Sequence, residues 1–536
     1  MTVMQGTRAA KRWTLLATVL GSAMVFLDST VVNVALPRIG QELQTPLFGI
    51  LEAQSYVYNG YLLTLSALLV LAGALNDFYG RRRMFAVGLV GFGLTSALCG
   101  IAPTMELLII FRILQGATGA LLVPGSLSIL TAAFKGEEQG QAFGIWAGAS
   151  AGTTILGPFI GGALVDSISW RAAFLINVPL AALALWATVR HVAESRDEEA
   201  SRRFDWLGAV VVALAVGGLS FGAIRGQERQ WQEALPFIAL AVGAAATIAL
   251  PFLMTKRPHP LVPPHLFRSR NFTVTNISTL AIYGALYVTF YFLPIFLQGT
   301  LRYNATAAGL ASVPGLVFLA LFSSRFGALA GRYGPRWFMA AGPAIMGLGS
   351  LWFLRVSSNG SPWQVRLENA SSLVPPPDYL TAILPGVIIF GLGAMVMVAP
   401  LTTCLMTSVP VRNSGLASAI NNAISRVGPQ LAGALIFVAV TATFYSGLQA
   451  RVEGVDFSSP QVRAAVSPLN RPAEEVPADV VEAAREESTQ AFHLAMLASA
   501  ALLFAGAIIN GAAIRNPTPT EVEARLQGTV SGEATV

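Results

Sequence analysis

Residues 73–83 read GALNDFYGRRR, and residues 327–336 read GALAGRYGPR. Each stretch follows a long apolar segment, and in each a Tyr-Gly pair precedes arginine. A loop that recurs between the second and third spans of each half predicts a parallel internal repeat, in which two six-helix bundles face each other. Short loops rich in glycine and arginine also recur by chance in membrane proteins, but the matching place within each half favours duplication.

The composition predicts a polytopic α-helical membrane protein. Of the 536 residues, 54% are hydrophobic and 12% are charged, whereas a soluble protein carries about 25% charged residues. The apolar residues come in blocks of about 20, the length that a helix needs to cross the hydrocarbon core. The alternating segments of about 10 residues that are typical of a β-barrel do not stand out. We expect fourteen spans, at residues 13–36, 52–75, 84–101, 105–125, 140–164, 172–190, 206–224, 235–254, 272–297, 308–328, 338–354, 380–402, 414–444 and 491–514.

The positions of lysine and arginine predict the orientation of these spans. Basic residues gather before the first span and in the 2–3, 6–7 and 8–9 loops, whereas the short loops on the other side hold few. Because the number of spans is even, both termini are expected on the cytoplasmic side of the cell (inner or plasma) membrane. Two long outer loops are expected at 355–379 and 445–490, the second with a short surface helix at 478–489.

The repeat and the spans together give the expected domains. The fold class is all-α: two six-helix bundles with pseudo-two-fold symmetry plus an inserted helix pair. The N-terminal bundle takes residues 1–200, the inserted pair (spans 7 and 8) takes 201–258, and the C-terminal bundle takes 259–514. Residues 515–536 form a cytoplasmic tail.

Several function classes lack their usual marks in this sequence. The two cysteines and four histidines are scattered, so no metal site is expected. A net charge of +6 spread over loops fits membrane orientation better than nucleic-acid binding. No Gly-x4-Gly-Lys-Ser/Thr motif indicates nucleotide binding, and no nucleophile–base–metal constellation indicates an enzyme.

Asp28 is an acid inside the first apolar span. It lies about 12 Å from the outer end of that span, and a carboxylate at such depth costs about 2.5–3.5 kcal/mol on insertion scales. Such residues mostly face a bundle interior or a wet cavity. Arg112 lies at nearly the same depth in the fourth span. We hypothesise that the two form a proton-sensitive pair; the alternative is a static, structural pair.

Six segments resemble one known family. They are LDSTVVNVALP (27–37), GALNDFYGRRRMF (73–85), RILQGATGALLVPG (112–125), LGPFIGGAL (156–164), WRAAFLINVP (170–179) and FDWLG (204–208). Together they resemble the signatures of the major facilitator superfamily, specifically its fourteen-span drug:proton antiporter branch. The resemblance implies a multidrug exporter that is driven by the proton gradient and needs no cofactor.

The resemblance also implies roles for two groups of residues. A conformational latch between the two halves would use Gly73, Asp77, Gly80 and Arg81. An antiporter motif that limits proton leak would use Gly157, Pro158, Gly161 and Gly162. The simpler alternatives are that the arginines only anchor the topology and that the fifth span is a generic proline-kinked packing helix.

The residues that contact substrate are the least defined by the sequence. Tyr283, Tyr287 and Tyr291 share one face of the ninth span, and such a stripe suits flat, apolar or cationic organic molecules. Plain helix packing is an equal alternative. Asn421 and Asn422 are polar groups at membrane depth, and we expect them to line the cavity of the C-terminal half.

The leading functional hypothesis is a proton-coupled exporter of small, mostly apolar or cationic organic molecules such as drugs. Its expected partners are a small-molecule substrate, protons and the lipid bilayer. The alternatives are a dedicated exporter of one native compound (a lipid, siderophore or antibiotic) and a transporter-like sensor that binds ligand without moving it. A membrane-fusion partner is a further option that leaves no mark in this sequence.

Overall fold

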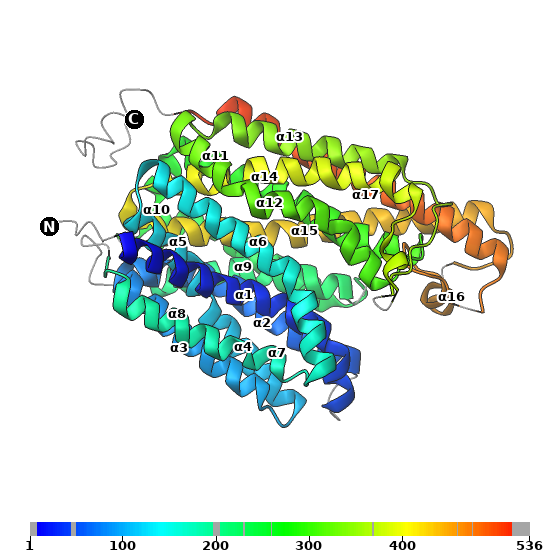
Figure 1. The fold of residues 1–536 in the computed structure, drawn as a ribbon, viewed down its shortest axis with the longest axis horizontal. Helices are drawn as coiled ribbons and strands as arrows, with labels where there is room; N and C mark the ends of the chain where they lie inside the picture. The colour runs from blue at the N-terminus through cyan, green and yellow to red at the C-terminus, as the bar shows by residue number, and fades with distance from the viewer. Residues whose placement is uncertain are drawn as a thin grey trace.

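The computed structural model describes residues 8–43, 50–196, 204–228, 231–258, 260–366, 369–457, 459–473 and 475–516. All regular elements in these ranges are helical (Figure 1). The helices of the first half are α1 (Arg8–Glu42), α2 (Ile50–Tyr79), α3 (Arg81–Gly100), α4 (Met105–Gly119), α5 (Leu122–Ala133), α6 (Gly136–Ser167), α7 (Ala172–Leu175) and α8 (Asn177–His191). Next come α9 (Trp206–Glu228) and α10 (Ala234–Lys256). The second half contains α11 (Arg270–Gly299), α12 (Ala305–Tyr333), α13 (Arg336–Trp352), α14 (Leu384–Thr407), α15 (Ser414–Arg451), α16 (Pro460–Ala465) and α17 (Ala478–Ala513).

The predicted membrane-spanning character of the chain is confirmed. Within the described residues, thirteen helical stretches are long and apolar enough to cross a membrane. The predicted span at 140–164 falls within α6, a helix of 32 residues in which several side chains lie outside the described part of the chain. Helices α4 and α5 follow each other closely and form one stretch, Met105–Ala133.

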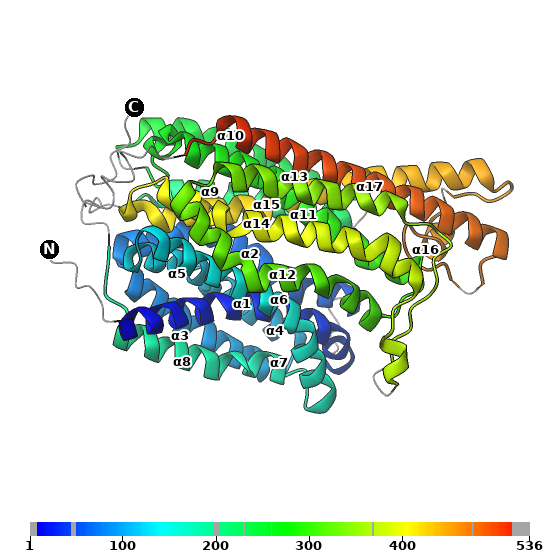
Figure 2. The same ribbon diagram turned by 45° about the horizontal axis from the view of Figure 1, so that its top comes forward.

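The helices form two bundles that lie side by side, with α1–α8 in one and α11–α15 and α17 in the other (Figure 2). Helices α9 and α10 pack on each other, and α9 also contacts α2 and α15. The predicted boundary at 200/201 lies outside the described residues, as does the predicted tail from residue 517 onward. Helix α1 begins and α17 ends at the same end of the molecule, which we call the terminal end (Figure 1).

The two repeated stretches make the same turn at the terminal end. Gly80 joins α2 to α3 with φ 107°, and Gly334 follows α12 with φ 86°. Side-chain-bearing residues rarely adopt such left-handed values, and therefore glycine recurs there. The connection between α2 and α3 is this one residue, so Arg81 begins a helix and is not part of a loop.

Small residues bring the two bundles together at the terminal end. Helix α6 meets α12 so closely that a Cβ on Gly144 would overlap the Cα of Ser324. Likewise, α2 meets α15 where a Cβ on Gly73 would lie 2.5 Å from the carbonyl oxygen of Gly415. Backbones approach this closely only where side chains are small. Away from this end the two bundles diverge (Figure 1).

The predicted short surface helix at 478–489 is wrong in one respect, because these residues are the first part of α17 and not a separate helix. Val480, Ala484 and Ala491 are buried in one hydrophobic cluster with the ends of α11 and α15. Their spacing puts them on one helix face. This packing allows α17 to begin at Ala478, well before its apolar segment.

Candidate functional site

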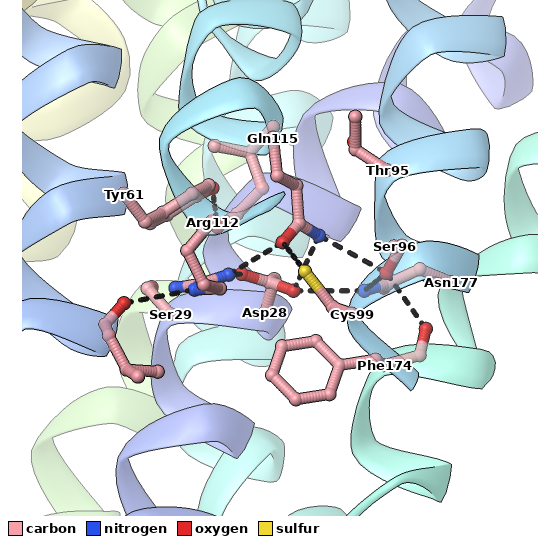
Figure 3. A network of polar contacts seen from close by, with 12 residues as sticks. Asp28, Ser29, Tyr61, Thr95, Ser96, Cys99, Arg112, Gln115, Phe174 and Asn177 are labelled. Carbon is pink, nitrogen blue, oxygen red and sulfur yellow. Dashed lines mark hydrogen bonds and ion pairs between the residues drawn. The ribbon is translucent and has the colours of Figure 1, made fainter. Parts of the chain in front are cut away.

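A buried polar network surrounds Asp28 in the middle of α1 (Figure 3). The carboxylate accepts hydrogen bonds from Arg112 Nη1 at 2.5 Å, Gln115 Nε2 at 3.0 Å and Asn177 Nδ2 at 3.0 Å. All four side chains are fully buried. The structure therefore brings together the two residues that the sequence paired, with α4 and α8 supplying the donors.

Arg112 also contacts the neighbouring helix α2. Its guanidinium lies 4.1 Å from the ring centre of Tyr61, and its Nε donates to the carbonyl oxygen of Val57 at 3.1 Å. Its Nη2 is buried and has no hydrogen-bond partner among the described residues. Arg112 therefore links the carboxylate of Asp28 in α1 to the side chain of Tyr61 and the backbone of Val57 in α2.

Gln115 and Asn177 belong to this network but were not among the residues predicted from the sequence. Gln115 lies one helical turn after Arg112, and its Oε1 accepts from Arg112 Nη1 at 2.8 Å. Asn177 begins α8, inside the motif WRAAFLINVP, and also donates to Ser96 Oγ at 3.0 Å. The i, i+3 spacing from Arg112 was the available signal for Gln115. Asn177 carried none beyond its place in a recognised motif.

A second ionic cluster joins the two bundles at the terminal end. The carboxylate of Asp77 accepts from the backbone amides of Gly415 at 3.2 Å and Leu416 at 2.8 Å, at the N-terminus of α15. Arg81 donates to the same carboxylate at 3.0 Å and also to the carbonyl oxygen of Val411. Both charged side chains are buried. An anion at a helix N-terminus satisfies free amides and is favoured by the helix dipole.

The predicted latch residues therefore lie together, since Gly73 packs on α15 and Gly80 makes the turn before Arg81. A Cβ on Gly415 would lie 2.8 Å from the carboxylate of Asp77, so this ion pair needs glycine on the facing helix as well. The cluster attaches α2 and α3 of one bundle to the N-terminus of α15 in the other.

The glycines of the fifth-span motif pack α6 against α1. A Cβ on Gly157 would overlap the hydroxyl of Thr30, and one on Gly161 would lie 3.0 Å from the Cα of Val31. Both contacts lie just beyond Asp28 along α1. Pro158 and Gly162 belong to the same helix, but their side-chain positions lie outside the described part.

A cavity of about 320 Å³ lies between the two bundles. Tyr283, Asn421 and Asn422 line it, where the sequence analysis expected substrate contacts. Tyr287 and Tyr291 do not line it; their rings stack on each other at 5.3 Å, and Tyr291 is 40% exposed. The stripe of three tyrosines is thus split between the cavity and packing.

The cavity lining is mainly apolar and includes one charged side chain among the described residues, Arg426 of α15. This arginine was not among the predicted site residues, although it lies twelve residues after Ser414, about 18 Å along the helix. Arginine at such depth is as unusual as Asp28 in the first span. Asp28 does not line the cavity, whereas its neighbours Phe26 and Ser29 do.

Comparisons with known proteins agree with this architecture. Residues 18–433 match the sequence pattern of the Major Facilitator Superfamily. Multidrug resistance protein Stp of Mycobacterium tuberculosis is 32% identical over 442 residues, which are 82% of this chain and 78% of Stp. The tetracenomycin C resistance and export protein of Streptomyces glaucescens is 30% identical, over 81% of this chain and 76% of that protein.

Among solved structures, the proton:xylose symporter XylE superposes with a TM-score of 0.57 at 14% identity, over 96% of this chain and 99% of that one. This likeness concerns the fold alone. The sequence match, the curated relatives and the paired bundles lead to one conclusion: the chain belongs to the Major Facilitator Superfamily.

Proposed function

We propose that the protein is a proton-coupled antiporter that exports small, largely apolar organic molecules. The observation that carries the proposal is the position of the central cavity, which lies beside the buried ion pair of Asp28 and Arg112 and between bundles that are joined at the terminal end. The relatives named above are resistance and export proteins, which supports export as the direction of transport.

In this mechanism Asp28 carries the exchangeable proton. A protonated Asp28 no longer neutralises Arg112, so the guanidinium must shift toward its remaining acceptors, Gln115 Oε1 and the Val57 carbonyl. A buried charge without a counter-ion is costly in a low dielectric. Protonation of Asp28 therefore raises the free energy of the helix arrangement that buries Arg112 and favours a different one. Each proton that crosses the membrane supplies about 2.3 kcal/mol per 100 mV of potential.

Helix α2 is the element that would transmit this change. It presents Tyr61 to the guanidinium of Arg112, and sixteen residues later it carries Asp77. The two sites are about 24 Å apart along one rigid helix. A displacement of α2 at Tyr61 therefore loosens the contacts of Asp77 with α15, which would release the terminal end.

We place the terminal end in the cytoplasm, because the basic residues of the sequence concentrate there. The cluster of Asp77 and Arg81 then acts as a latch that closes the cytoplasmic side while the cavity faces outward. Helix α6 packs through Gly157 and Gly161 against α1 next to Asp28. In this position it limits the leak of protons through the site.

Transport in reconstituted liposomes tests the proposal. Liposomes loaded with a lipophilic dye such as Nile red, and bearing an imposed pH gradient, should show protein-dependent dye movement that a protonophore abolishes. Dye binding without movement would mean a sensor and would refute the export hypothesis. A panel of dissimilar dyes separates the multidrug case from a dedicated exporter, since the latter would move only one of them.

A further inference from the structure

Arg426 has no counter-ion in the described structure. It is partly buried on α15, it lines the central cavity, and no hydrogen bond or ion pair joins it to another described residue. Among the described residues, Tyr58 and Tyr61 of α2 lie close enough to interact with it electrostatically. A phenol is uncharged at neutral pH, so neither neutralises the guanidinium.

Asp28 already has its own cationic partner, Arg112. Asp28 is held by three donors inside the first bundle and does not line the cavity. Among the described lining residues there is no carboxylate. An arginine at membrane depth normally pairs with an acid or with backbone carbonyls. Since the described lining residues supply no such acid, a molecule bound in the cavity is the candidate partner of Arg426.

The rest of the lining fits the body of an organic molecule. Phe26 and Trp146 present aromatic surface from the first bundle, and Tyr283 does so from the second. Asn422 adds an amide one turn before Arg426 on the same helix. A volume of about 320 Å³ is at the lower end of the range of drug-sized pockets, about 300–1,000 Å³.

We propose that the cavity selects organic anions, and that Arg426 binds their acidic group while the aromatic side chains hold an apolar body. The guanidinium offers a planar fork of N–H donors that matches a carboxylate or an acidic enol in two-point contact. This inference rests on the proposed function and names its substrate class. It departs from the expectation of cationic substrates, to which the described lining offers no negative charge.

Binding to the purified full-length protein in phosphatidylcholine nanodiscs tests the proposal. Three probes share one ring system and differ in charge: pyrenebutyrate, pyrenebutanol and pyrenebutyl-trimethylammonium. We expect the wild-type protein to bind the anion most tightly and the cation least. The R426Q variant should lose about 10–100-fold of its affinity for pyrenebutyrate, equivalent to about 1.4–2.8 kcal/mol. Its affinity for pyrenebutanol should stay unchanged, which also verifies that the variant is folded.

Two variants serve as controls. R426K keeps the charge and should retain the preference for the anion, even if R426Q does not fold. R332Q removes an exposed arginine at the end of α12 and should leave all three affinities as they are. Equal affinities of the wild-type protein for anion and cation, or an R426Q variant that still prefers pyrenebutyrate, would overturn the proposal.

A further arm separates a free organic anion from a lipid headgroup. Adding phosphatidylglycerol to the nanodiscs should not weaken pyrenebutyrate binding, and strong competition would overturn the assignment to free organic anions. The binding assay is independent of transport. Charge selectivity can therefore fail while Nile red is still exported, and export can fail while selectivity is observed.

Discussion

Replacing Asp28 with asparagine removes the one negative charge in a site that has three hydrogen-bond donors. In the wild-type protein the carboxylate accepts from Arg112, Gln115 and Asn177, and all four side chains are fully buried. The amide of asparagine has a single acceptor oxygen, and its NH₂ group faces the same donors. Arg112 would then be a buried cation without a counter-ion.

The structure sets the size of the effect. Removing one partner of a buried ion pair costs about 3–5 kcal/mol, and Arg112 Nη2 has no hydrogen-bond partner among the described residues even in the wild-type protein. We expect D28N to be destabilised by about this amount. The double variant D28N/R112Q removes the uncompensated charge and should regain most of the lost stability. Neither variant has a titratable side chain at position 28.

Two measurements on the same preparations separate stability from coupling. Denaturant unfolding in nanodiscs gives the order of stability, with wild type above D28N/R112Q and D28N lowest. Nile red transport in liposomes with an imposed pH gradient should fall to the level of protein-free liposomes in both variants. Full proton-driven transport by D28N would refute Asp28 as the proton carrier. Transport that returns in the double variant would show that the loss in D28N was only a stability effect.

Three further perturbations address the latch, the seam between bundles and the cavity. D77N should shift the equilibrium between the closed and open states of the terminal end about 10–100-fold toward the open state, because it weakens charge-assisted bonds to α15. Distances between spin labels on α2 and α15 measure this shift. An unchanged distance distribution would contradict the latch. G144A should hinder closure of the same end because its Cβ would meet the backbone of Ser324, whereas G309A, on an open face of α12, should not; equal transport by both would argue against the seam. Y283A should weaken binding of pyrenebutanol about 2–10-fold, while Y291A, whose ring lies outside the cavity lining, should not; equilibrium binding in nanodiscs decides, and the reverse order would assign substrate contact to the stacked pair.

Much of the fold depends on local sequence and was therefore predicted. A span needs only enough consecutive apolar residues, which any window of the chain displays. The repeat was predicted as well, since Gly80 and Gly334 both occupy left-handed turns that the pattern Tyr-Gly marks in each half. Burial of a charge at membrane depth is costly enough that Asp28 and Arg112 could be paired by depth alone.

Helix ends were less predictable, because they depend on packing beyond the bilayer. Nothing in residues 478–489 says that the helix continues into the last span; burial of Val480 and Ala484 against the other helices decides it. In the same way, the sequence predicts arginines in a loop after Gly80, whereas Arg81 is buried because Asp77 and the carbonyl of Val411 bind it.

The sequence by itself determined the class of the protein, the membrane-spanning helices and the charged pair in the first half. Only the tertiary structure decided which face of each helix meets the cavity. It put Tyr283 in the lining and Tyr291 outside it, and it left Arg426 facing the cavity without a described counter-ion. The physical reason is that a helix that is apolar on all sides carries no mark of its inward face, so its orientation is set by the neighbours against which it packs.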